Sequence, residues 1–235
     1  AAQQSTDRPN LGIAPDARIV PVRIMGRCGG NTADVAAGIL WAVGEQIPDV
    51  PVNPNPARII NISLAGAAPR CPLSLQAAID IAREKGAIVV TASGSSARDT
   101  KAITPANCAG VIAVGAVDKF GERAPTSNFG DEVTLSAFGG NMATGERNGV
   151  FTTTNTGRYR PRKPAVGYYQ SSSAAAARVS GALAVLAARA PDATASDLEA
   201  QLLANTDTFA PGQCDAGEGN CGEGILNLAR IVAKS

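Results

Sequence analysis

Three consecutive serines stand ahead of an apolar stretch in the sequence GYYQSSSAAAARVSG, which runs from Gly167 to Gly181. A serine hydroxyl can act as a nucleophile, and the free backbone N–H groups at a helix start favour developing negative charge. The alternative is that small residues simply begin a helix here. For Ser173 taken alone that alternative is the stronger one, because a serine hydroxyl needs a base to remove its proton.

A base is difficult to find, because the 235-residue chain contains no histidine. Its absence argues against every mechanism in which this chain would use its own imidazole, including histidine-ligated zinc. Lysine can serve as a base in principle. Lys119 lies in a predicted turn and Lys163 in a proline-rich loop, however, and neither spacing favours that role.

The metal and cofactor signals are equally sparse. No CxxC pair indicates structural zinc, and the loop carboxylates Asp99, Asp118 and Asp131 do not follow a calcium-binding spacing. We therefore expect no required cofactor and no metal in the active site, with structural calcium not readable from the sequence.

The composition favours a water-soluble globular chain. Lysine plus arginine number 21 and aspartate plus glutamate 20, so the net charge of +1 gives no electrostatic reason to expect nucleic acid or an anionic membrane as partner. No apolar stretch approaches the roughly 20 residues of a membrane span. The polar start AAQQSTDRPN lacks the apolar segment of a signal peptide, so we expect any targeting segment to have been removed. We expect one domain over residues 1–235.

Cysteine usage favours a secreted protein. The chain has five cysteines, and because five is odd at least one is free or pairs outside the chain. Cys214 and Cys221 bracket the short loop DAGEGN, which could close as a disulfide. This usage favours an oxidising compartment, extracellular or periplasmic, over the cytosol.

Hydrophobic patterning predicts alternating strands and helices. Apolar runs predict strands over 17–25, 57–64, 87–92, 110–117 and 132–138, and helical spacing predicts helices over 32–46, 74–86, 174–190 and 196–205. This alternation is typical of an α/β fold with a mostly parallel sheet and helices on both faces.

Small residues come after three of the predicted strands, in SLAG (63–66), ASGSS (92–96) and FGG (138–140). Ligands of such sheets bind beyond the carboxyl ends of the strands. With the serine run at a helix start, these segments suit an oxyanion or a phosphate. The alternative is that the glycines only make tight turns, and a phosphate-binding protein has no Walker or GxGxxG motif to support it.

Taken together and in order, these segments resemble the subtilases, the subtilisin-like serine proteases. The resemblance runs through GIAPDARIVPVRIMGRCGGNTADVAAGILWAVG, NPNPARIINISLAG, GAIVVTASGSS, TPANCAGVIAVGAVDKFGERAPTSNFGDEVTLSAFGG and YQSSSAAAARVSGALAVL, nearly the whole chain. The last segment aligns with the family's nucleophile motif Gly-Thr-Ser-Met-Ala-x-Pro-His-Val-x-Gly. The resemblance is to the disulfide-containing secreted branch, and it implies a three-layer subtilisin-like fold, with or without the family's first strands.

The resemblance also assigns roles residue by residue. Ser173 falls on the nucleophile and Ser95 on the asparagine that donates to the oxyanion. The walls of the primary specificity pocket fall on Leu64, Ala65 and Gly66 and, opposite, on Ala92, Ser93 and Gly94. Among cysteines it implies Cys28–Cys71 and Cys214–Cys221 bridges, and leaves Cys108 without a partner.

Several positions depart from the family pattern. Ser171 replaces a glycine, Ala177 a proline and Arg178 a histidine in the nucleophile motif. The Ser95 hydroxyl is a shorter donor than asparagine, and loss of such a donor costs about 100- to 1,000-fold in turnover. Ala65 replaces a pocket glycine and Phe138 a proline.

The family's Asp strand and His helix have no counterpart among these residues. AAQQSTDRPNLGIAP resembles the segment directly after the family's His helix, so no Asp or His is assigned to those roles. In the family the Asp strand lies inside the sheet, and its absence predicts a gap between 17–25 and 57–64. We expect a missing N-terminal segment or a complementing chain to fill it.

Two functions of different classes are consistent with these features. In the first, the chain is the larger, C-terminal part of a secreted serine endopeptidase, which cleaves peptide or protein substrates through Ser173 when the Asp/His segment is supplied and is inactive alone. In the second, it is a pseudoenzyme, a binding or interaction protein on a catalytically dead subtilase fold.

Overall fold

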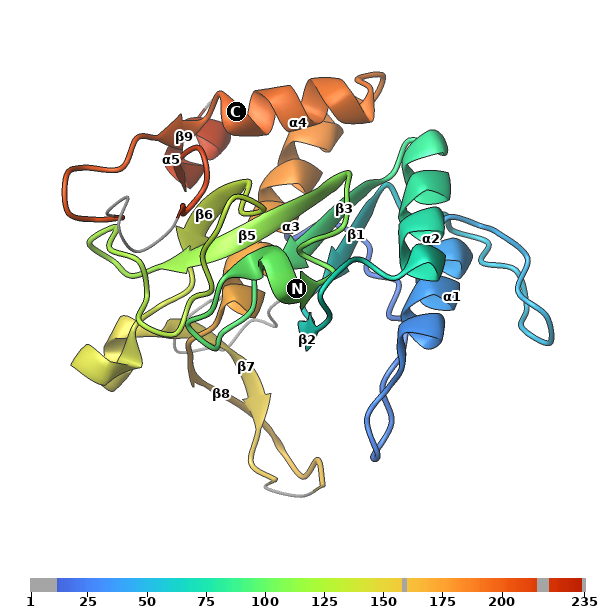
Figure 1. Ribbon diagram of the computed structural model, residues 1–235, viewed down its shortest axis with the longest axis horizontal. Helices are drawn as coiled ribbons and strands as arrows, with labels where there is room; N and C mark the ends of the chain where they lie inside the picture. Colours follow the sequence, from blue (N-terminus) through green and yellow to red (C-terminus); the bar gives the residue numbers. More distant parts are fainter. Residues whose placement is uncertain (1–11, 158–159, 215–219, 234–235) are drawn as a thin grey trace.

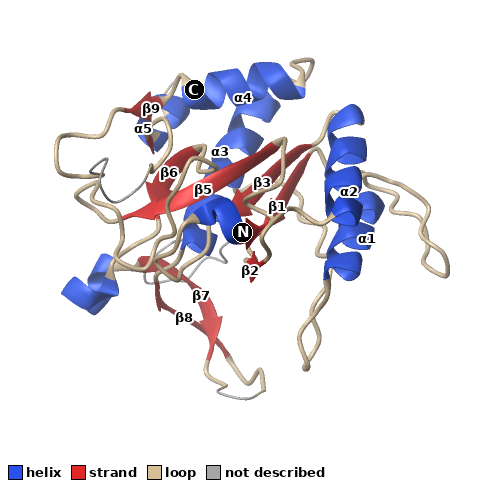
Figure 2. Ribbon diagram, viewed as in Figure 1, coloured by secondary structure: helices blue, strands red, loops and turns tan. Residues whose placement is uncertain are grey.

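A computed structural model describes residues 12–157, 160–214 and 220–233. The N-terminal stretch AAQQSTDRPN lies outside these residues. The main sheet has the strand order β1-β3-β5-β6-β10-β9, and two small two-stranded sheets, β2–β4 and β7–β8, lie beside it (Figures 1 and 2). The strands are β1 (Ile59–Ile62), β2 (Gly66–Ala67), β3 (Ile88–Ala92), β4 (Ile103–Thr104), β5 (Val111–Val117), β6 (Leu135–Phe138), β7 (Val150–Asn155), β8 (Pro164–Tyr169), β9 (Thr206–Asp207) and β10 (Ile225–Leu226). The α-helices are α1 (Thr32–Ala42), α2 (Leu73–Glu84), α3 (Ser172–Arg189), α4 (Ala195–Leu203) and α5 (Leu228–Val232), and the 3-10 helices are η1 (Thr100–Ala102), η2 (Met142–Thr144) and η3 (Glu146–Asn148).

The sheet confirms the predicted α/β class. Strands β1, β3, β5, β6 and β10 run parallel, and only β9 pairs antiparallel, with β10. The strands predicted at 57–64, 87–92 and 110–117 are β1, β3 and β5, which lie side by side in that order. Their register pairs Ile59 with Ile88, and Val89 with Val111.

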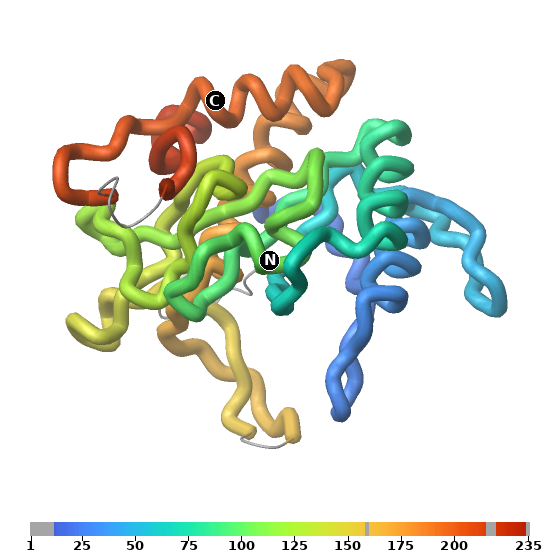
Figure 3. Tube along the Cα trace, viewed as in Figure 1, coloured from blue at the N-terminus to red at the C-terminus, as the bar shows by residue number. Residues whose placement is uncertain are grey.

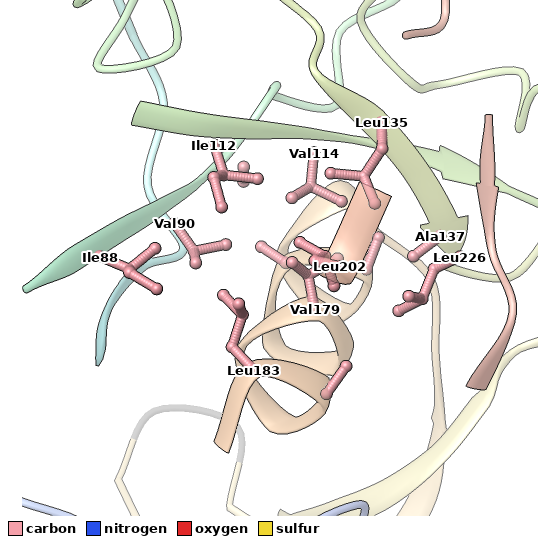
Figure 4. Close-up of a cluster of buried hydrophobic side chains, with 14 of the residues drawn as sticks. Ile88, Val90, Ile112, Val114, Leu135, Ala137, Val179, Leu183, Leu202 and Leu226 are labelled. Atoms are coloured by element: carbon pink, nitrogen blue, oxygen red, sulfur yellow. The ribbon is translucent and has the colours of Figure 1, made fainter. Parts of the chain in front are cut away.

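Helices cover both faces of the sheet and produce three layers (Figure 1). One core lies against α1 and α2, where Ile39, Ile60 and Ile79 pack together. The other lies against α3. Figure 4 shows side chains of β3, β5 and β6, including Val90, Val114 and Leu135, directed toward Val179 and Leu183 of this helix. Alternate residues of β3 face opposite layers, which explains the unbroken apolar run of its sequence.

Two helices, α3 and α4, lie where the sequence predicted them, and the structure shows which residue caps the start of each. α3 begins at Ser172 with Ser171 as its N-cap. α4 begins after Thr194, whose hydroxyl accepts from the Asp197 N–H while the Asp197 carboxylate accepts from the Thr194 N–H. This reciprocal pairing is a capping box, which satisfies two backbone donors at the start of α4.

The strand predicted at 17–25 was wrong: the described structure assigns these residues no strand. β1 is the last strand of the main sheet on this side. A cavity of about 450 Å³ separates Val20, Val22 and Ile24 from β1, so no ladder partner is within reach and an apolar segment alone cannot make a strand. The gap expected between 17–25 and 57–64 is present in the part of the chain that is described.

The disulfides correct one predicted pairing. Cys71 bonds Cys108, with Cα atoms 4.9 Å apart, and Cys28 is free and exposed. The prediction of Cys28–Cys71 was wrong because Cys28 lies in the turn between Gly26 and Gly29, which belongs to the segment on the far side of the gap. The predicted Cys214–Cys221 disulfide is present.

The hairpin β7–β8 extends from the body of the molecule before α3 (Figure 3). Six residue pairs join its strands, from Val150↔Tyr169 to Asn155↔Pro164. The proline-rich segment that holds Lys163 was predicted as a loop, but β8 begins directly after it at Pro164, and residues 158 and 159 lie outside the described set.

Candidate active site

The three small-residue segments meet at the start of α3. SLAG comes after β1, ASGSS after β3 and FGG after β6, so parallel strands deliver all three to one edge of the sheet. Ser63 bonds Ser173, Gly94 bonds Ser172, and the Ser171 N–H donates to the Gly139 carbonyl at 3.0 Å. The strand ends therefore form one site around the serine run.

Ser173 is half-buried in the first turn of α3, beside the end of β1. Its hydroxyl donates to the Ser63 carbonyl at 3.3 Å, and the Ser63 hydroxyl donates to the Ser173 carbonyl at 3.1 Å. A carbonyl oxygen cannot remove a proton, so this arrangement orients the Ser173 hydroxyl without activating it.

The neighbouring serines form a compact hydrogen-bonded cluster with Ser95. The Ser95 hydroxyl accepts from the Ser172 N–H at 3.1 Å and shares hydrogen bonds of 3.1 and 3.2 Å with the Ser171 and Ser172 hydroxyls. The Ser172 hydroxyl in turn accepts from the Gly94 N–H at 3.0 Å. This cluster fixes the helix start against the loop after β3.

The same cluster occupies the helix-start donors that an oxyanion would require. The Ser173 N–H donates to the Ser171 hydroxyl at 3.0 Å, and the Ser172 N–H donates to Ser95. The Ala174 N–H donates to the Ser171 carbonyl. A helix N-terminus normally offers free donors, but here serine hydroxyls and the Ser171 carbonyl accept from them.

Asn128 is a buried residue that sequence reasoning missed, and it shapes the loop after β3. Its side-chain oxygen accepts from the Ser96 and Arg98 N–H groups at 3.0 Å, and its amide donates to the Ser93 carbonyl at 2.8 Å. Asn128 is 2% exposed. The stretch TSNFG carried no chemical signal of its own, because its partners come from a loop about 30 residues away in the chain.

Gly94 shows why this loop needs a glycine. Its φ is +102°, and a Cβ built there would lie 2.3 Å from the Asn128 amide nitrogen. The same Cβ would lie 3.2 Å from the Ala65 Cβ. The predicted pocket walls therefore approach one another at Ala65 and Gly94.

The other predicted wall residues lie on these same two segments. Leu64 is half-buried, and Ala65 and Gly66 are exposed, with Gly66 opening β2. Ala92 ends β3, and Ser93 is fully buried. Ser93 thus contributes its backbone rather than an accessible hydroxyl.

Arg178, which stands where the family has histidine, has a different role from an imidazole. Its guanidinium lies 5.0 Å from the centre of the Phe138 ring, and its Nε is buried with no hydrogen-bond partner. Desolvation by burial lowers the pKa of Arg178 from its ordinary value. Arg178 and Phe138, which both depart from the family pattern, therefore contact each other.

The family model for subtilases, Peptidase_S8, matches residues 1–221. The chain belongs to the subtilase family. This subtilase is 38% identical over 221 residues to an extracellular protease of Xanthomonas campestris pv. campestris, and 35% identical over 224 residues to an extracellular basic protease of Dichelobacter nodosus. Each match covers 94% of the chain, but only 36% and 35% of those relatives. The chain thus spans about a third of the length of these relatives.

Solved structures agree with the subtilisin-like fold. A protease of Pseudoalteromonas arctica superposes with a TM-score of 0.88 at 39% identity, over 95% of this chain and 64% of that one. A cold-adapted subtilisin-like serine proteinase gives a TM-score of 0.71 at 21% identity, over 96% of this chain and 71% of the other, and supports the fold alone.

The described residues show neither a metal-binding cluster nor a membrane-spanning helix. Within the described ranges, no group of three or more His, Cys, Asp or Glu side chains could hold a metal ion. Among the described helices, none is long and apolar enough to cross a membrane.

Proposed function

We propose that this subtilase chain carries the substrate cleft and nucleophile of a serine endopeptidase, and that it hydrolyses peptide bonds only when a segment bearing Asp and His completes the sheet. The observation that carries the proposal is the position of Ser173, at the start of α3 beside the carboxyl ends of β1 and β3. The substrates would be peptides or proteins that lie between the SLAG and ASGS segments.

The chemistry would be acyl transfer. A base on the added segment takes the proton from the Ser173 hydroxyl, whose oxygen attacks the peptide carbonyl and forms an acyl-enzyme. The base then gives that proton to the leaving amine, and water releases the acid and restores the serine. Donors at the start of α3 and at residue 95 would stabilise the oxyanion.

The cavity beside β1 supports the need for an additional segment. It is lined by apolar side chains from both sides, among them Val22, Ile24, Ile39, Ile60 and Ile62. A strand inserted there would cover these side chains and pair the free edge of β1. The inserted strand would be the Asp strand of the family, and a preceding segment or a second chain would both suit the site.

The second candidate function, a binding protein without catalysis, is favoured by the serine cluster. The Ser171 hydroxyl accepts a hydrogen bond from the Ser173 N–H, and the Ser95 hydroxyl accepts one from the Ser172 N–H. A peptide carbonyl in the cleft would have to displace these hydroxyls before it gained an oxyanion donor.

A complementation assay distinguishes the two functions. The chain is produced alone and as a chimera in which the Asp strand and His helix of an active subtilase precede residue 1, and hydrolysis of a peptide library is followed by mass spectrometry. We expect no hydrolysis by the chain and measurable hydrolysis by the chimera, lost in Ser173→Ala. A folded chimera that binds peptides but never cleaves them would favour the binding protein.

The serine cluster is tested in the same chimera. Replacing Ser171 by Gly and Ser95 by Asn should raise turnover by about 100-fold, because one oxyanion donor is worth about 100- to 1,000-fold. Unchanged turnover would show that the hydroxyls do not obstruct the oxyanion site.

The proposed location is outside the cytoplasm, in the extracellular medium or periplasm. The two disulfides and the extracellular names of the relatives support it.

A further inference from the structure

The net charge of +1 conceals a strong separation of charge along the chain. Residues 147–191 include no aspartate or glutamate but seven basic residues, namely Arg147, Arg158, Arg160, Arg162, Lys163, Arg178 and Arg189. Subtracting these seven from the 21 basic residues leaves 14 against 20 acidic residues elsewhere. A positive region therefore adjoins a body with a net charge of −6.

Three of these cations gather on the β7–β8 hairpin. Arg160, Arg162 and Lys163 are exposed, and the described structure pairs none of their side chains with a carboxylate. Pro161, between Arg160 and Arg162, and Pro164, directly after Lys163, fix the backbone φ at their positions. Glu146, the nearest acidic residue in the sequence, lies in η3 at the base of the hairpin.

The hairpin leads directly into the serine run of the site. β8 ends at Tyr169, and the serine run starts two residues later at Ser171. A six-residue strand is about 20 Å long, so the three cations, which precede β8, lie about that distance from its end at Tyr169. An extended peptide covers the same distance in about six residues.

We propose that this hairpin is a distal docking arm for acidic peptide segments, which binds carboxylates about six residues from the bond presented to Ser173. The proposal rests on the cleft described under Proposed function and names the substrate class of that site. The net negative charge of the rest of the chain repels large polyanions. A short peptide bound in the cleft, by contrast, extends only to the positively charged hairpin. An isolated two-stranded hairpin is also marginally stable in water, and a bound acidic segment would stabilise it.

The test measures binding by the full chain carrying Ser173→Ala, so that no probe is cleaved. Fluorescein-labelled dodecapeptides contain six neutral residues followed by six residues that include four glutamates, or the same halves in reverse order. Their Gln counterparts serve as controls, and affinity is followed by fluorescence anisotropy at about 50 mM salt, where surface charges are weakly screened. We expect one order to bind at least about tenfold more tightly than its Gln counterpart.

Two charge variants locate the effect. R160E/R162E/K163E should abolish the preference for Glu over Gln, and R70E/K101E/K119E, which gives the same net charge, should keep it. Loss of the preference for Glu over Gln in both variants would overturn the proposal that the hairpin binds acidic segments. Equal affinity of the parent chain for the Glu and Gln peptides would overturn it as well. Tighter binding to vesicles containing phosphatidylserine than to the peptides would assign the arm to a lipid surface and overturn it as well.

Half-length probes separate failure of the arm from failure of the cleft. If the glutamate half alone binds as tightly as the dodecapeptide, the arm stands and the cleft proposal fails. If the neutral half binds and glutamates add nothing, the cleft stands and the arm fails.

Discussion

The two sides of the main sheet differ in how completely they are packed. Around α3, Val179, Leu183 and Leu135 are fully buried between the helix and the sheet. At the other edge, β1 faces a cavity of about 450 Å³, and Ile19 on the opposite segment is 59% exposed. The difference indicates that the proposed nucleophile, Ser173, is supported by a well-packed core, whereas the region proposed to receive a base-bearing segment is open.

The same contrast appears in the covalent and polar contacts. Cys71 and Cys108 join in the packed part, while Cys28 stays free on the segment across the gap. Asn128 has its hydrogen bonds within the loop beside the serines, whereas Asn61 is exposed on the edge strand. Packing and disulfide bridging therefore both weaken toward the gap.

The largest expected effect is a loss of core packing. Leu183→Ala should lower the free energy of unfolding by about 4 kcal/mol, because it leaves a cavity among fully buried side chains. Ile24→Ala, beside the existing cavity, should cost less than about 1.5 kcal/mol. Urea unfolding measures both, and equal losses would show that the two regions are packed alike.

The second largest expected effect is the loss of stability on removing the Cys71–Cys108 disulfide. Cys71→Ser should destabilise the protein by about 3 kcal/mol, because the bridge to Cys108 closes a loop over a sequence separation of 37. Cys28→Ser should leave stability within about 0.5 kcal/mol. The melting temperatures of both variants, with peptide mapping of the bridges, provide the check. A Cys28–Cys71 peptide would restore the pairing implied by the family resemblance.

A smaller effect is expected at the loop beside the serines. Asn128→Ala leaves the Ser96 and Arg98 N–H groups without their acceptor and should cost about 2 kcal/mol, with faster amide exchange over 93–98. Asn61→Ala, on the exposed edge strand, should cost under about 1 kcal/mol. Hydrogen exchange that is unchanged at 93–98 would rule out Asn128 as the residue that holds this loop.

The smallest effect is a pH dependence on α4. The Thr194 hydroxyl, and then its backbone N–H, hold the pKa of Asp197 below its usual value. The folded pKa is therefore below the unfolded one, so the stabilisation is present above the unfolded pKa and is lost as pH falls through the folded pKa. Asp197→Asn should lower Tm slightly at about pH 7, and the difference from the parent should shrink in acid. A difference that stays constant down to about pH 2 would contradict this cause.

The sequence predicted those features that depend on local pattern. The runs at β3 and β5 were apolar because both faces of these strands are buried, and helical spacing located α3 and α4. The meeting of the SLAG, ASGSS and FGG segments could be expected from the parallel sheet.

Features that depend on distant partners were not predictable in this way. Segment 17–25 has a strand's composition but no ladder partner, so composition misassigned it. Cys28 and Cys108 are both plausible partners for Cys71 in sequence, and only the position of the gap separates them. The hydrogen bond from the Ser173 N–H to the Ser171 hydroxyl depends on side-chain geometry, and a family sequence motif does not specify that geometry.

The central claim of the proposed function is that the described residues orient the Ser173 hydroxyl through the Ser63 carbonyl without activating it. Labelling with a fluorophosphonate probe, read by peptide mapping of the purified chain, tests it most directly, because the probe reacts with an activated serine and needs no substrate preference. We predict no label at Ser173 in the chain alone, and label in the chimera that carries the Asp strand and His helix. Stoichiometric label at Ser173 in the chain alone, abolished by Ser173→Ala, would contradict the account.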